Sequence, residues 1–370
     1  MSEEGMTYKE AGVDTVLGNE ASEIFDNACK ATYKNREGKI GEVIRMGDEF
    51  SGLRCMSLGG LAGVRQGANT DGIGTAVEIA QRIKKHDTMG YNLVAMCAED
   101  ASRDGGEPVW MTNLLDVNSL KGHLEYVRQL ATGLVNAANE AGIAVINGEI
   151  AELGELVGGY GSFHYNWSAS LNWVAVENKL IDGKSIKPGH SLVGLVENGF
   201  RSNGFTLIRR IMQKNYGDEW HEAQPELAEQ IIERPTIYSG LIAEMQGKWN
   251  EPPKVAITGI VHVTGGGVPE KLGRLLQRTG YGAVVDNPFE PCGAMKTLQE
   301  LGNVADREAY KTWNMGQGMI IVTPEPESVM EYALKKGILA QEMGIIQEEP
   351  KINIVSKGVK EPGKELVFPE

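Results

Sequence analysis

"ANTDGIGTAVEIA", residues 68–80, places a single carboxylate, Asp71, in a glycine-rich turn directly before a helical pattern. The apolar residues after the turn recur at i, i+3, i+4 and i+7, the spacing of one helix face: Ala76, Ile79, Ala80 and Ile83. Helix starts attract anions through their free N–H groups, so the glycine amides could face phosphate oxygens while Asp71 holds a divalent cation. Taken alone, the pattern is explained at least as well by a tight turn in which Asp71 caps the helix.

The composition is that of a folded protein with two domains or lobes. The chain has 370 residues, of which 41% are hydrophobic and 23% charged, and single cores rarely grow beyond about 250–300 residues. The formal net charge of −14 argues against a nucleic-acid partner, because phosphate backbones are bound by basic surfaces. No apolar run approaches the roughly 18 residues of a membrane span and no secretory signal opens the chain, so we expect a cytoplasmic protein without a membrane partner.

The four cysteines lie far apart, without a C-x-x-C pair, which gives no support to zinc or thioredoxin-like chemistry: Cys29, Cys55, Cys97 and Cys292. Cys55 and Cys97 lie in apolar surroundings, so we expect them to be buried thiols of a reducing compartment.

Helical and strand patterns alternate along the chain, which predicts α/β or α+β layers. Residues 122–142 carry the clearest helical stripe, and residues 143–147, "IAVIN", follow as a short buried strand. Residues 168–178, "SASLNWVAVEN", alternate like a strand with one solvated face. Turn sequences near residues 178–189 favour a boundary there, so we expect an N-terminal domain over residues 1–177 and a C-terminal domain over residues 178–370.

The C-terminal half repeats the order of strand, glycine-rich loop and helix. "SLVGLV" (191–196) predicts a strand, "FTLIRRIMQKN" (205–215) predicts a helix, and a long helical segment follows to about residue 246. Near the N-terminus a helical piece is expected around residues 20–34, and the charged tail after residue 348 is typical of an edge strand or a frayed end.

Two acidic segments could hold a divalent cation. "CAEDASRDGGEPV" (97–109) contains Glu99, Asp100 and Asp104, and "NGEIAELG" (147–154) places Glu149 directly after the predicted strand. Carboxylate oxygens are ligands that Mg²⁺ prefers, and open sheets place ligands at the carboxyl ends of their strands. Solvated acidic loops explain both segments equally well.

Two further loops suggest anion binding. "VHVTGGGVPEKLGRLL" (261–276) has Thr264 and three successive glycines before a helix, and glycine runs let backbone N–H groups approach an anion closely. "GFRSNGF" (199–205) offers Arg201, Ser202 and Asn203 before another helix, although an ordinary capped helix start is an equal alternative. No Walker P-loop, G-x-S-x-G elbow or G-x-G-x-x-G after a strand is present.

Taken in order, these segments resemble one family closely, the phosphoribosylformylglycinamidine cyclo-ligases. The resemblance covers residues 7–346 and rests on the ordered set of motifs rather than on any one of them: "YKEAGVDTVLGN", "NTDGIGT", "KHDTMGYNLVAMCAED", "GGEP", "NGEIAELG", "IDGKSIKPG", "RSNGFTLIRRI", "HVTGGG" and "YKTWNMGQGM".

The resemblance implies a two-lobed α+β fold whose N-terminal lobes pair in a homodimer around a shared β-barrel. It also implies a small-molecule nucleotide substrate, ATP and Mg²⁺. ATP phosphorylates the formyl amide oxygen of the substrate, and an internal nitrogen then displaces phosphate to close the imidazole ring. By matching position, the metal ligands would be Asp71, Asp100 and Glu149, which with Asn203 form the expected catalytic set. The expected nucleotide and phosphate contacts are Gly72, Gly74, Thr75, Arg201, Ser202, Gly204, Thr264, Gly265, Gly266, Gly267 and Asn314.

Several positions depart from the family pattern. Ala76 stands where the family usually has lysine, and Asn92 and Asn166 stand where it has acids; Glu99 could restore part of the charge lost at Asn92. Lys311 replaces an arginine and cannot form its bidentate phosphate contact. Two alternatives therefore stay open. One is another enzyme of the superfamily, such as thiamine-phosphate kinase, selenophosphate synthetase or the hydrogenase-maturation ATPase; the other is a nucleotide-binding relative without turnover.

Overall fold

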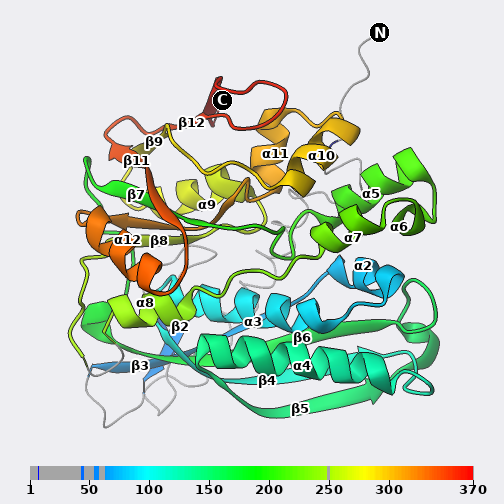
Figure 1. Cartoon of the computed structure of the whole chain (residues 1–370). Coiled ribbons are helices and arrows are strands. Elements are labelled where there is room, and N and C mark those ends of the chain that lie inside the picture. The colour runs from blue at the N-terminus through cyan, green and yellow to red at the C-terminus, as the bar shows by residue number, and fades with distance from the viewer. Residues whose placement is uncertain (1–6, 8–42, 46–53, 58–62, 248–250, 370) are drawn as a thin grey trace.

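The computed structural model describes residues 7, 43–45, 54–57, 63–247 and 251–369, and it arranges them in two lobes, each built on one sheet (Figure 1). The first sheet has six strands within residues 43–176, and the second has seven strands within residues 191–368. The predicted α+β class with two lobes is confirmed.

The first lobe consists of β1 (Val43–Arg45), β2 (Arg54–Ser57), β3 (Val64–Gly72), α2 (Ala76–Ile83), α3 (Asp87–Ser102), β4 (Glu107–Val117), α4 (Leu124–Ala141), β5 (Ala144–Glu152) and β6 (Tyr165–Val176). The strand order is β1-β2-β3-β6-β4-β5. Strands β4 and β5 run parallel and the other neighbours run antiparallel.

Helices α3 and α4 lie on one side of this sheet, and the core forms between α3 and the strands (Figure 1). Alternate residues of β6 are buried, as its period-2 pattern predicts. The two helices approach closely because Gly90 and Gly133 meet at their contact: a Cβ on Gly90 would lie 2.1 Å from the Leu134 nitrogen, and a Cβ on Gly133 would lie 1.8 Å from the Asp87 carbonyl oxygen. The predicted helix over residues 122–142 is confirmed as α4, which ends at Gly142 in the left-handed conformation.

The second lobe consists of β7 (Ser191–Val196), α5 (Phe205–Tyr216), α6 (Trp220–Ala223), α7 (Pro225–Ile231), α8 (Ser239–Met245), β8 (Gly259–His262), α9 (Gly267–Leu276), β9 (Gly282–Val285), α10 (Gly293–Leu301), α11 (Asp306–Thr312), β10 (Gln317–Thr323), α12 (Pro326–Lys335), β11 (Ala340–Gln347), β12 (Ile352–Val355) and β13 (Glu365–Phe368). Its strand order is β13-β12-β9-β11-β7-β10-β8, so the tail ends in an edge strand, as predicted.

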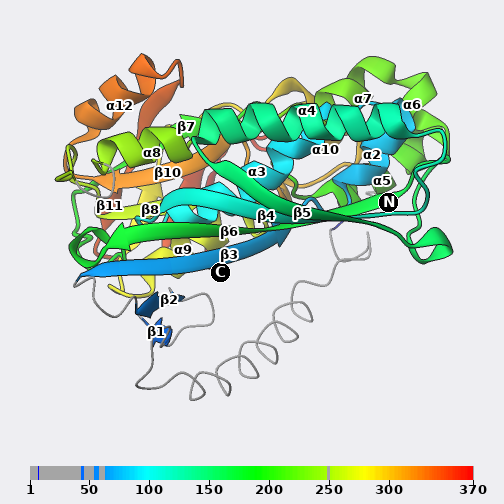
Figure 2. The same ribbon diagram turned by 90° about the horizontal axis from the view of Figure 1, so that it is seen from below.

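Two expectations about single elements are wrong. Residues 144–152 form β5, but this strand lies at the edge of its sheet and is exposed along almost its whole length. In Figure 2 the strands of this sheet are seen from below, and none of the labelled helices covers that side. The long helical segment expected up to residue 246 is instead three short helices, α6, α7 and α8, because Pro225 and Pro235 interrupt the helical pattern.

Other expectations concern the ends of the chain and the membrane. The helix expected around residues 20–34 lies outside the described residues. Across the described ranges, no helix combines the length and the apolar character that crossing a bilayer requires.

Candidate functional site

Asp71 is the second-to-last residue of β3, where the first lobe meets the second. Its Oδ1 accepts a hydrogen bond from the Gly72 amide at 2.7 Å. Burial, assisted by the negative charge of nearby Asp100, raises the pKa of Asp71 to about 6. The charges of Lys271 and Arg103 act in the opposite direction. The structure thus brings together two of the three predicted metal ligands.

Asp100 lies in the last turn of α3 and is held by two partners. Its Oδ1 is 2.9 Å from Nδ1 of His262 and 3.3 Å from Nη1 of Arg103. Burial alone would raise the pKa of Asp100, but Arg103 and the His262 hydrogen bond hold it well below its ordinary value. Asp100 is therefore a carboxylate at neutral pH, as a metal ligand must be.

His262, at the end of β8, links Asp100 to a buried arginine. Its Nε2 is 3.0 Å from Nη2 of Arg201. A guanidinium only donates hydrogen bonds, so Nε2 accepts and the proton lies on Nδ1, which donates to Asp100. Burial lowers the pKa of His262 to about 4, in agreement with a neutral ring.

Arg201 does not face the surface, which corrects its predicted phosphate contact. Its side chain and that of Glu197 are fully buried and pair at 2.7 Å. Its Nη1 also donates to the Thr236 carbonyl oxygen at 2.7 Å. With its guanidinium also bonded to His262, Arg201 anchors the 199–204 loop from inside rather than reaching a ligand.

The rest of this loop turns in the left-handed region. Arg201, Ser202 and Gly204 have φ values of 48°, 58° and 74°, and a Cβ on Gly204 would lie 2.4 Å from Nε1 of Trp313. Ser202 donates to Oδ1 of Asn92 at 2.6 Å, so it joins the loop to α3. Asn203 remains half-buried beside the glycine loop.

The three glycines before α9 have different roles. Gly266 and Gly267 have φ values of 92° and 61°, and a Cβ on Gly267 would lie 1.9 Å from the Tyr310 carbonyl oxygen. Gly265 is exposed, and a Cβ there would meet only Oδ1 of Asn203, at 3.3 Å. The structure therefore brings the two predicted phosphate loops together at Gly265 and Asn203, while Gly267 is required for packing. Thr264, just before them, is largely buried, and its carbonyl oxygen accepts from the Gly267 amide at 2.9 Å.

Asn314 and Thr75 have contrasting positions. Asn314 is 2% exposed, donates to the Gly199 carbonyl oxygen at 2.7 Å and accepts from the Gly316 amide at 2.9 Å. Its amide is used to hold loops together, which corrects the predicted ligand contact. Gly74 and Thr75 are exposed at the start of α2, and the Thr75 hydroxyl lies 3.3 Å from that of Thr206 on α5.

Glu149 is not brought to Asp71 within the chain. It lies inside the exposed strand β5, not in a loop after a buried strand, and it pairs with Leu114 of β4. Leu114 pairs with Ser168 of β6, which pairs with Gly72 of β3. Three strand spacings, about 14 Å, therefore separate the backbone of Glu149 from that of Gly72.

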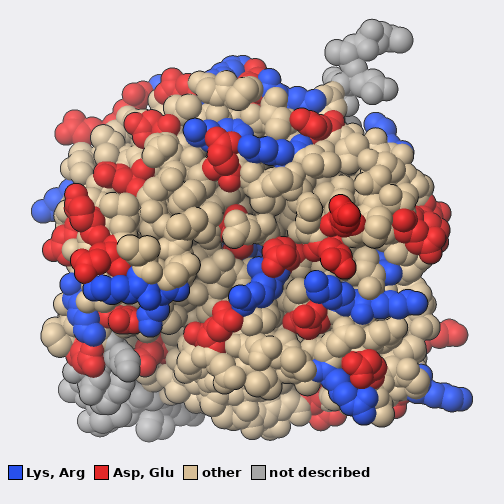
Figure 3. Space-filling view, viewed as in Figure 1, with Lys and Arg blue, Asp and Glu red and all other residues tan. Residues whose placement is uncertain are grey.

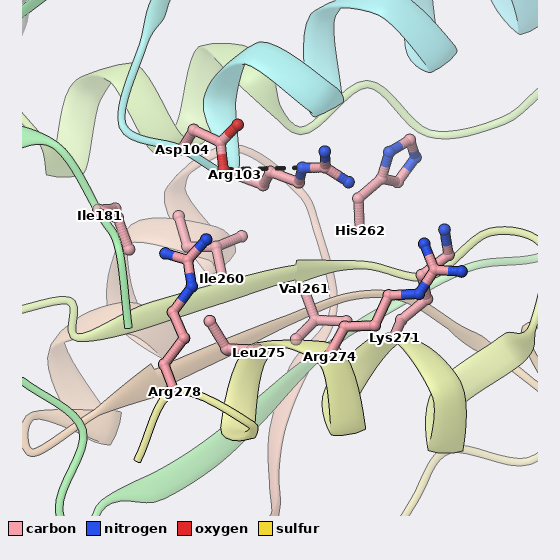
Figure 4. A pocket seen from close by; sticks show the side chains of 10 residues that line it. All are labelled: Arg103, Asp104, Ile181, Ile260, Val261, His262, Lys271, Arg274, Leu275 and Arg278. Atoms are coloured by element: carbon pink, nitrogen blue, oxygen red, sulfur yellow. Dashed lines mark ion pairs between the residues drawn. The ribbon is translucent and has the colours of Figure 1, made fainter. Parts of the chain in front are cut away.

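A cation-lined pocket adjoins Asp100, and none of its cations was among the predicted site residues. Four basic side chains border it, from the end of α3 and from α9 with the residues after it: Arg103, Lys271, Arg274 and Arg278. In Figure 4, Lys271 and Arg274 lie side by side, while Arg103 with Asp104 and Arg278 border other parts of the pocket. The remaining lining is mostly apolar, from Ile181, Ile260, Val261 and Leu275.

Away from this pocket the surface has mixed charge. On the face shown in Figure 3, basic and acidic side chains are interspersed rather than gathered in one basic patch. The basic pocket is thus a local feature of a chain whose net charge is −14.

Comparison with known proteins decides the family. Residues 62–163 match the model of the "AIR synthase related protein, N-terminal domain", and residues 187–357 match that of the corresponding C-terminal domain. The phosphoribosylformylglycinamidine cyclo-ligase of Acetivibrio thermocellus is 33% identical over 89% of this chain and 93% of the relative. The chain belongs to the phosphoribosylformylglycinamidine cyclo-ligase family.

Other comparisons agree with this family. The cyclo-ligase of Pyrococcus furiosus is 32% identical over 96% of this chain and 99% of its own length. Among solved structures, the HypE–HypF complex matches 85% of this chain and 92% of that chain with a TM-score of 0.56 at 18% identity. Thiamine-monophosphate kinase from Stenotrophomonas maltophilia matches 90% of this chain and 95% of that chain with a TM-score of 0.54 at 13% identity. These solved structures share the fold.

Asn92 stands where the cyclo-ligase pattern has an acid, and the contacts of its side chain explain the neutral amide. The Asn92 side chain is 2% exposed, donates to the Thr88 carbonyl oxygen at 3.0 Å and accepts from Ser202. Glu99 does not replace the missing acid, because it points toward α8 and accepts from the Tyr238 and Ser239 amides at 2.7 and 3.1 Å. Burial raises the pKa of Glu99 to about 7. The expectation that Glu99 compensates for Asn92 is therefore wrong.

At Ala76 the lysine of the cyclo-ligase pattern is missing, but positive charge near Asp71 is not. Ala76 is fully buried in the core, whereas the cyclo-ligase pattern has lysine at this position. The positive charges of Lys271 and Arg103 act on Asp71 instead. A cation is therefore still present beside the carboxylate pair, supplied by α9 and by the end of α3.

Proposed function

We propose that this chain catalyses the ATP-dependent closure of formylglycinamidine ribonucleotide to aminoimidazole ribonucleotide, with release of ADP and phosphate. The observation that carries the proposal is that Asp71 lies close to Asp100, which is hydrogen-bonded across the two lobes to His262 just before the glycine loop, in a chain that matches its cyclo-ligase relatives over most of their length. An enzyme that phosphorylates one part of a substrate and closes a ring with another must hold both reacting ends in one orientation.

The carboxylate pair fits a Mg²⁺ ion. Asp71 accepts only the Gly72 amide among the described groups, and the repulsion between the two carboxylates would be relieved by a bound cation. Bound there, Mg²⁺ would neutralise charge on the transferring phosphoryl group. Nucleotide binding is supported by a solved structure of the same fold, "AaThiL complexed with AMPPCP and TMP", which matches with a TM-score of 0.53.

The solvent exposure of the other predicted site residues indicates which of them can contact phosphate or substrate. The amides of Gly74 and Gly265 and the hydroxyl of Thr75 are placed to contact phosphate oxygens, because these residues are exposed to solvent, whereas the Gly72 amide is used by Asp71. Ser202 and Asn203 would face the substrate from the second lobe. In this scheme residues 1–177 supply the metal and ATP contacts, and residues 178–370 supply the substrate contacts.

We propose a homodimer formed by the first lobe. Among the described residues, no strand pairs with the outer edge of β5, and its apolar side chains are exposed, with Ile146 at 58% and Ile150 at 47%. Exposed apolar strands at a sheet edge are sites of association. Glu149 could join Asp71 only from a second copy, because two strands separate these residues within one chain.

The direct test measures ADP formation by the purified protein with Mg-ATP and formylglycinamidine ribonucleotide. We expect ADP and aminoimidazole ribonucleotide in equal amounts, and no ADP when the ribonucleotide is left out. Asp71→Asn should abolish most of the turnover, whereas the exposed Asp286→Asn serves as the matched control. Mg-ATP binding without turnover of this substrate would reject the proposal.

A further inference from the structure

The pocket beside Asp100 is lined by several positively charged side chains that lie close together. Of its lining residues four are basic and one, Asp104, is acidic. Arg103 is shared between Asp100 and Asp104, at 3.3 and 3.7 Å, and Arg274 pairs with Glu270 on the same helix. Lys271 forms no ion pair with any described residue. It is half-buried, and the positive charges of Arg274 and Arg103 each act on it more strongly than the negative charges of Asp100 and Glu270.

The position of Lys271 is electrostatically unfavourable for a positive charge. Burial, together with the charges of Arg274 and Arg103, lowers its pKa to about 8. An ammonium group that costs stability in the absence of a ligand is typical of a binding site, where an anion would relieve the repulsion. The apolar lining of Ile260, Val261 and Leu275 strengthens such an attraction, because charges beside apolar walls are less screened than in water.

The size of the pocket limits what can enter. Its cavity has a volume of about 70 Å³, whereas pockets that hold a whole drug-sized ligand have roughly 300–1,000 Å³. A single phosphate group fits this space, and a nucleoside or a triphosphate chain does not. Arg103, which pairs with Asp100 at 3.3 Å, borders the cavity, so a phosphate inside it would lie next to the carboxylate pair.

We propose that Arg103, Lys271, Arg274 and Arg278 form the receptor for the phosphate monoester of the substrate, next to the Asp71 and Asp100 pair that would serve ATP. The proposal rests on the proposed function and specifies which end of the substrate enters between α3 and α9. Guanidinium groups bind phosphate oxygens in pairs, and Lys271 adds a point charge. The site would therefore select a phosphorylated substrate over the same compound without its phosphate.

The test separates the two substrates kinetically. Lys271→Gln and Arg278→Gln should each raise the KM for formylglycinamidine ribonucleotide by about 10- to 100-fold, the effect of losing a hydrogen bond to a charged group. The KM for ATP should change little. Lys271→Arg should restore most of the affinity, and Arg128→Gln, on the exposed side of α4, is the matched control. A rise in the KM for ATP, with the ribonucleotide KM unchanged, would overturn the proposal.

A binding experiment keeps the test independent of turnover. Calorimetry with ribose 5-phosphate should show binding to the full chain that Lys271→Gln weakens at least tenfold, whereas ribose should not bind. Equal binding of ribose 5-phosphate by both proteins would overturn the receptor even if the enzyme is active. If the wild-type protein has no cyclo-ligase activity but shows this Lys271-dependent binding, the receptor stands and the proposed function fails.

The stability of the Lys271→Gln variant shows whether its loss of binding could be due to a folding defect. Because Lys271 is repelled by its neighbours and has no ion pair, Lys271→Gln should raise the urea midpoint or leave it unchanged while binding weakens. A lowered midpoint would identify Lys271 as a structural residue and contradict its assignment to a receptor.

Discussion

Asp100 and His262 are joined across the two lobes by a hydrogen bond of 2.9 Å, in which Nδ1 of His262 donates to the carboxylate. The direction of this bond is fixed from the other side of the ring, because Arg201 donates to Nε2 at 3.0 Å. A buried Glu197–Arg201 ion pair thus orients the histidine, and the histidine orients a proposed metal ligand.

Removal of His262 should impair turnover through its effect on Asp100, a proposed metal ligand. His262→Ala leaves Asp100 and Arg201 each with one partner fewer, so we expect a loss of about 10- to 100-fold in kcat/KM or in Mg²⁺ affinity. His262→Asn places an amide donor close to the position of Nδ1 and should recover part of this loss. Steady-state kinetics over a range of Mg²⁺ concentrations measures both effects. Equal activities for the alanine and asparagine variants would show that the bond to Asp100 has no role.

Restoring the family acid at residue 92 should not improve this protein. In Asn92→Asp the carboxylate can still accept from Ser202, but it cannot donate to the Thr88 carbonyl oxygen, and the new charge is almost fully buried. We expect a loss of about 1–3 kcal/mol in the free energy of unfolding, measured by urea denaturation. Ser202→Ala, which removes the same link without adding a charge, is the comparison variant and should cost less. A gain in turnover by Asn92→Asp would instead mean that an acid is missing from the active site.

The sequence predicted the elements whose patterns are local and missed properties that depend on distant partners. The stripe of α4 and the alternation of β6 are set by which face meets the core, so both were predicted correctly. The apolar run in β5 is typical of a buried strand, but the chain itself provides nothing described that covers Val145 and Ile146. A local pattern of apolar residues predicts that a strand is covered, but it cannot show whether another part of the same chain covers it.

The residues of the candidate site were also predicted only in part. Asp71 and Asp100 were chosen from glycine-rich and acidic loops, and they do lie close together. Arg201 and Asn314 were chosen from the same kind of loop, but their side chains point inward, and the direction of a loop side chain is not encoded in its spacing. The basic pocket did leave a trace in the sequence, since Lys271 and Arg274 are three residues apart on α9 and Arg278 follows just after the end of this helix.

Stability should depend on the neutral state of a histidine in the first lobe. His86 is 1% exposed, its Nδ1 lies 3.0 Å from the Tyr165 hydroxyl, and burial lowers its pKa to about 4. Below its ordinary pKa of about 6.5 the unfolded chain binds a proton that the folded chain does not, so stability is lost as the pH falls from about 6.5 to about 4. Each such histidine contributes at most about 1.4 kcal/mol per pH unit.

The pH dependence can be assigned to His86 by substitution. Urea unfolding at pH 7.5 and pH 5 should show a smaller difference for His86→Gln than for the wild-type protein. His262, whose pKa is also lowered to about 4, should keep part of the slope in that variant. Parallel curves for the two proteins would show that His86 does not titrate in this range.

The edge strand β5 gives the last prediction, which concerns the oligomeric state. If β5 pairs with a second copy, Ile146→Asp places a charge in the centre of the contact and should convert a dimer to a monomer, because buried unpaired charges cost several kcal/mol. Leu334→Asp, on α12 of the other lobe, is the matched control, since Leu334 is also exposed, at 73%. Size-exclusion chromatography with light scattering should give twice the chain mass for the wild-type protein and for Leu334→Asp, and the single-chain mass for Ile146→Asp. A monomeric wild-type protein would reject the dimer and would also leave Glu149 without a route to Asp71.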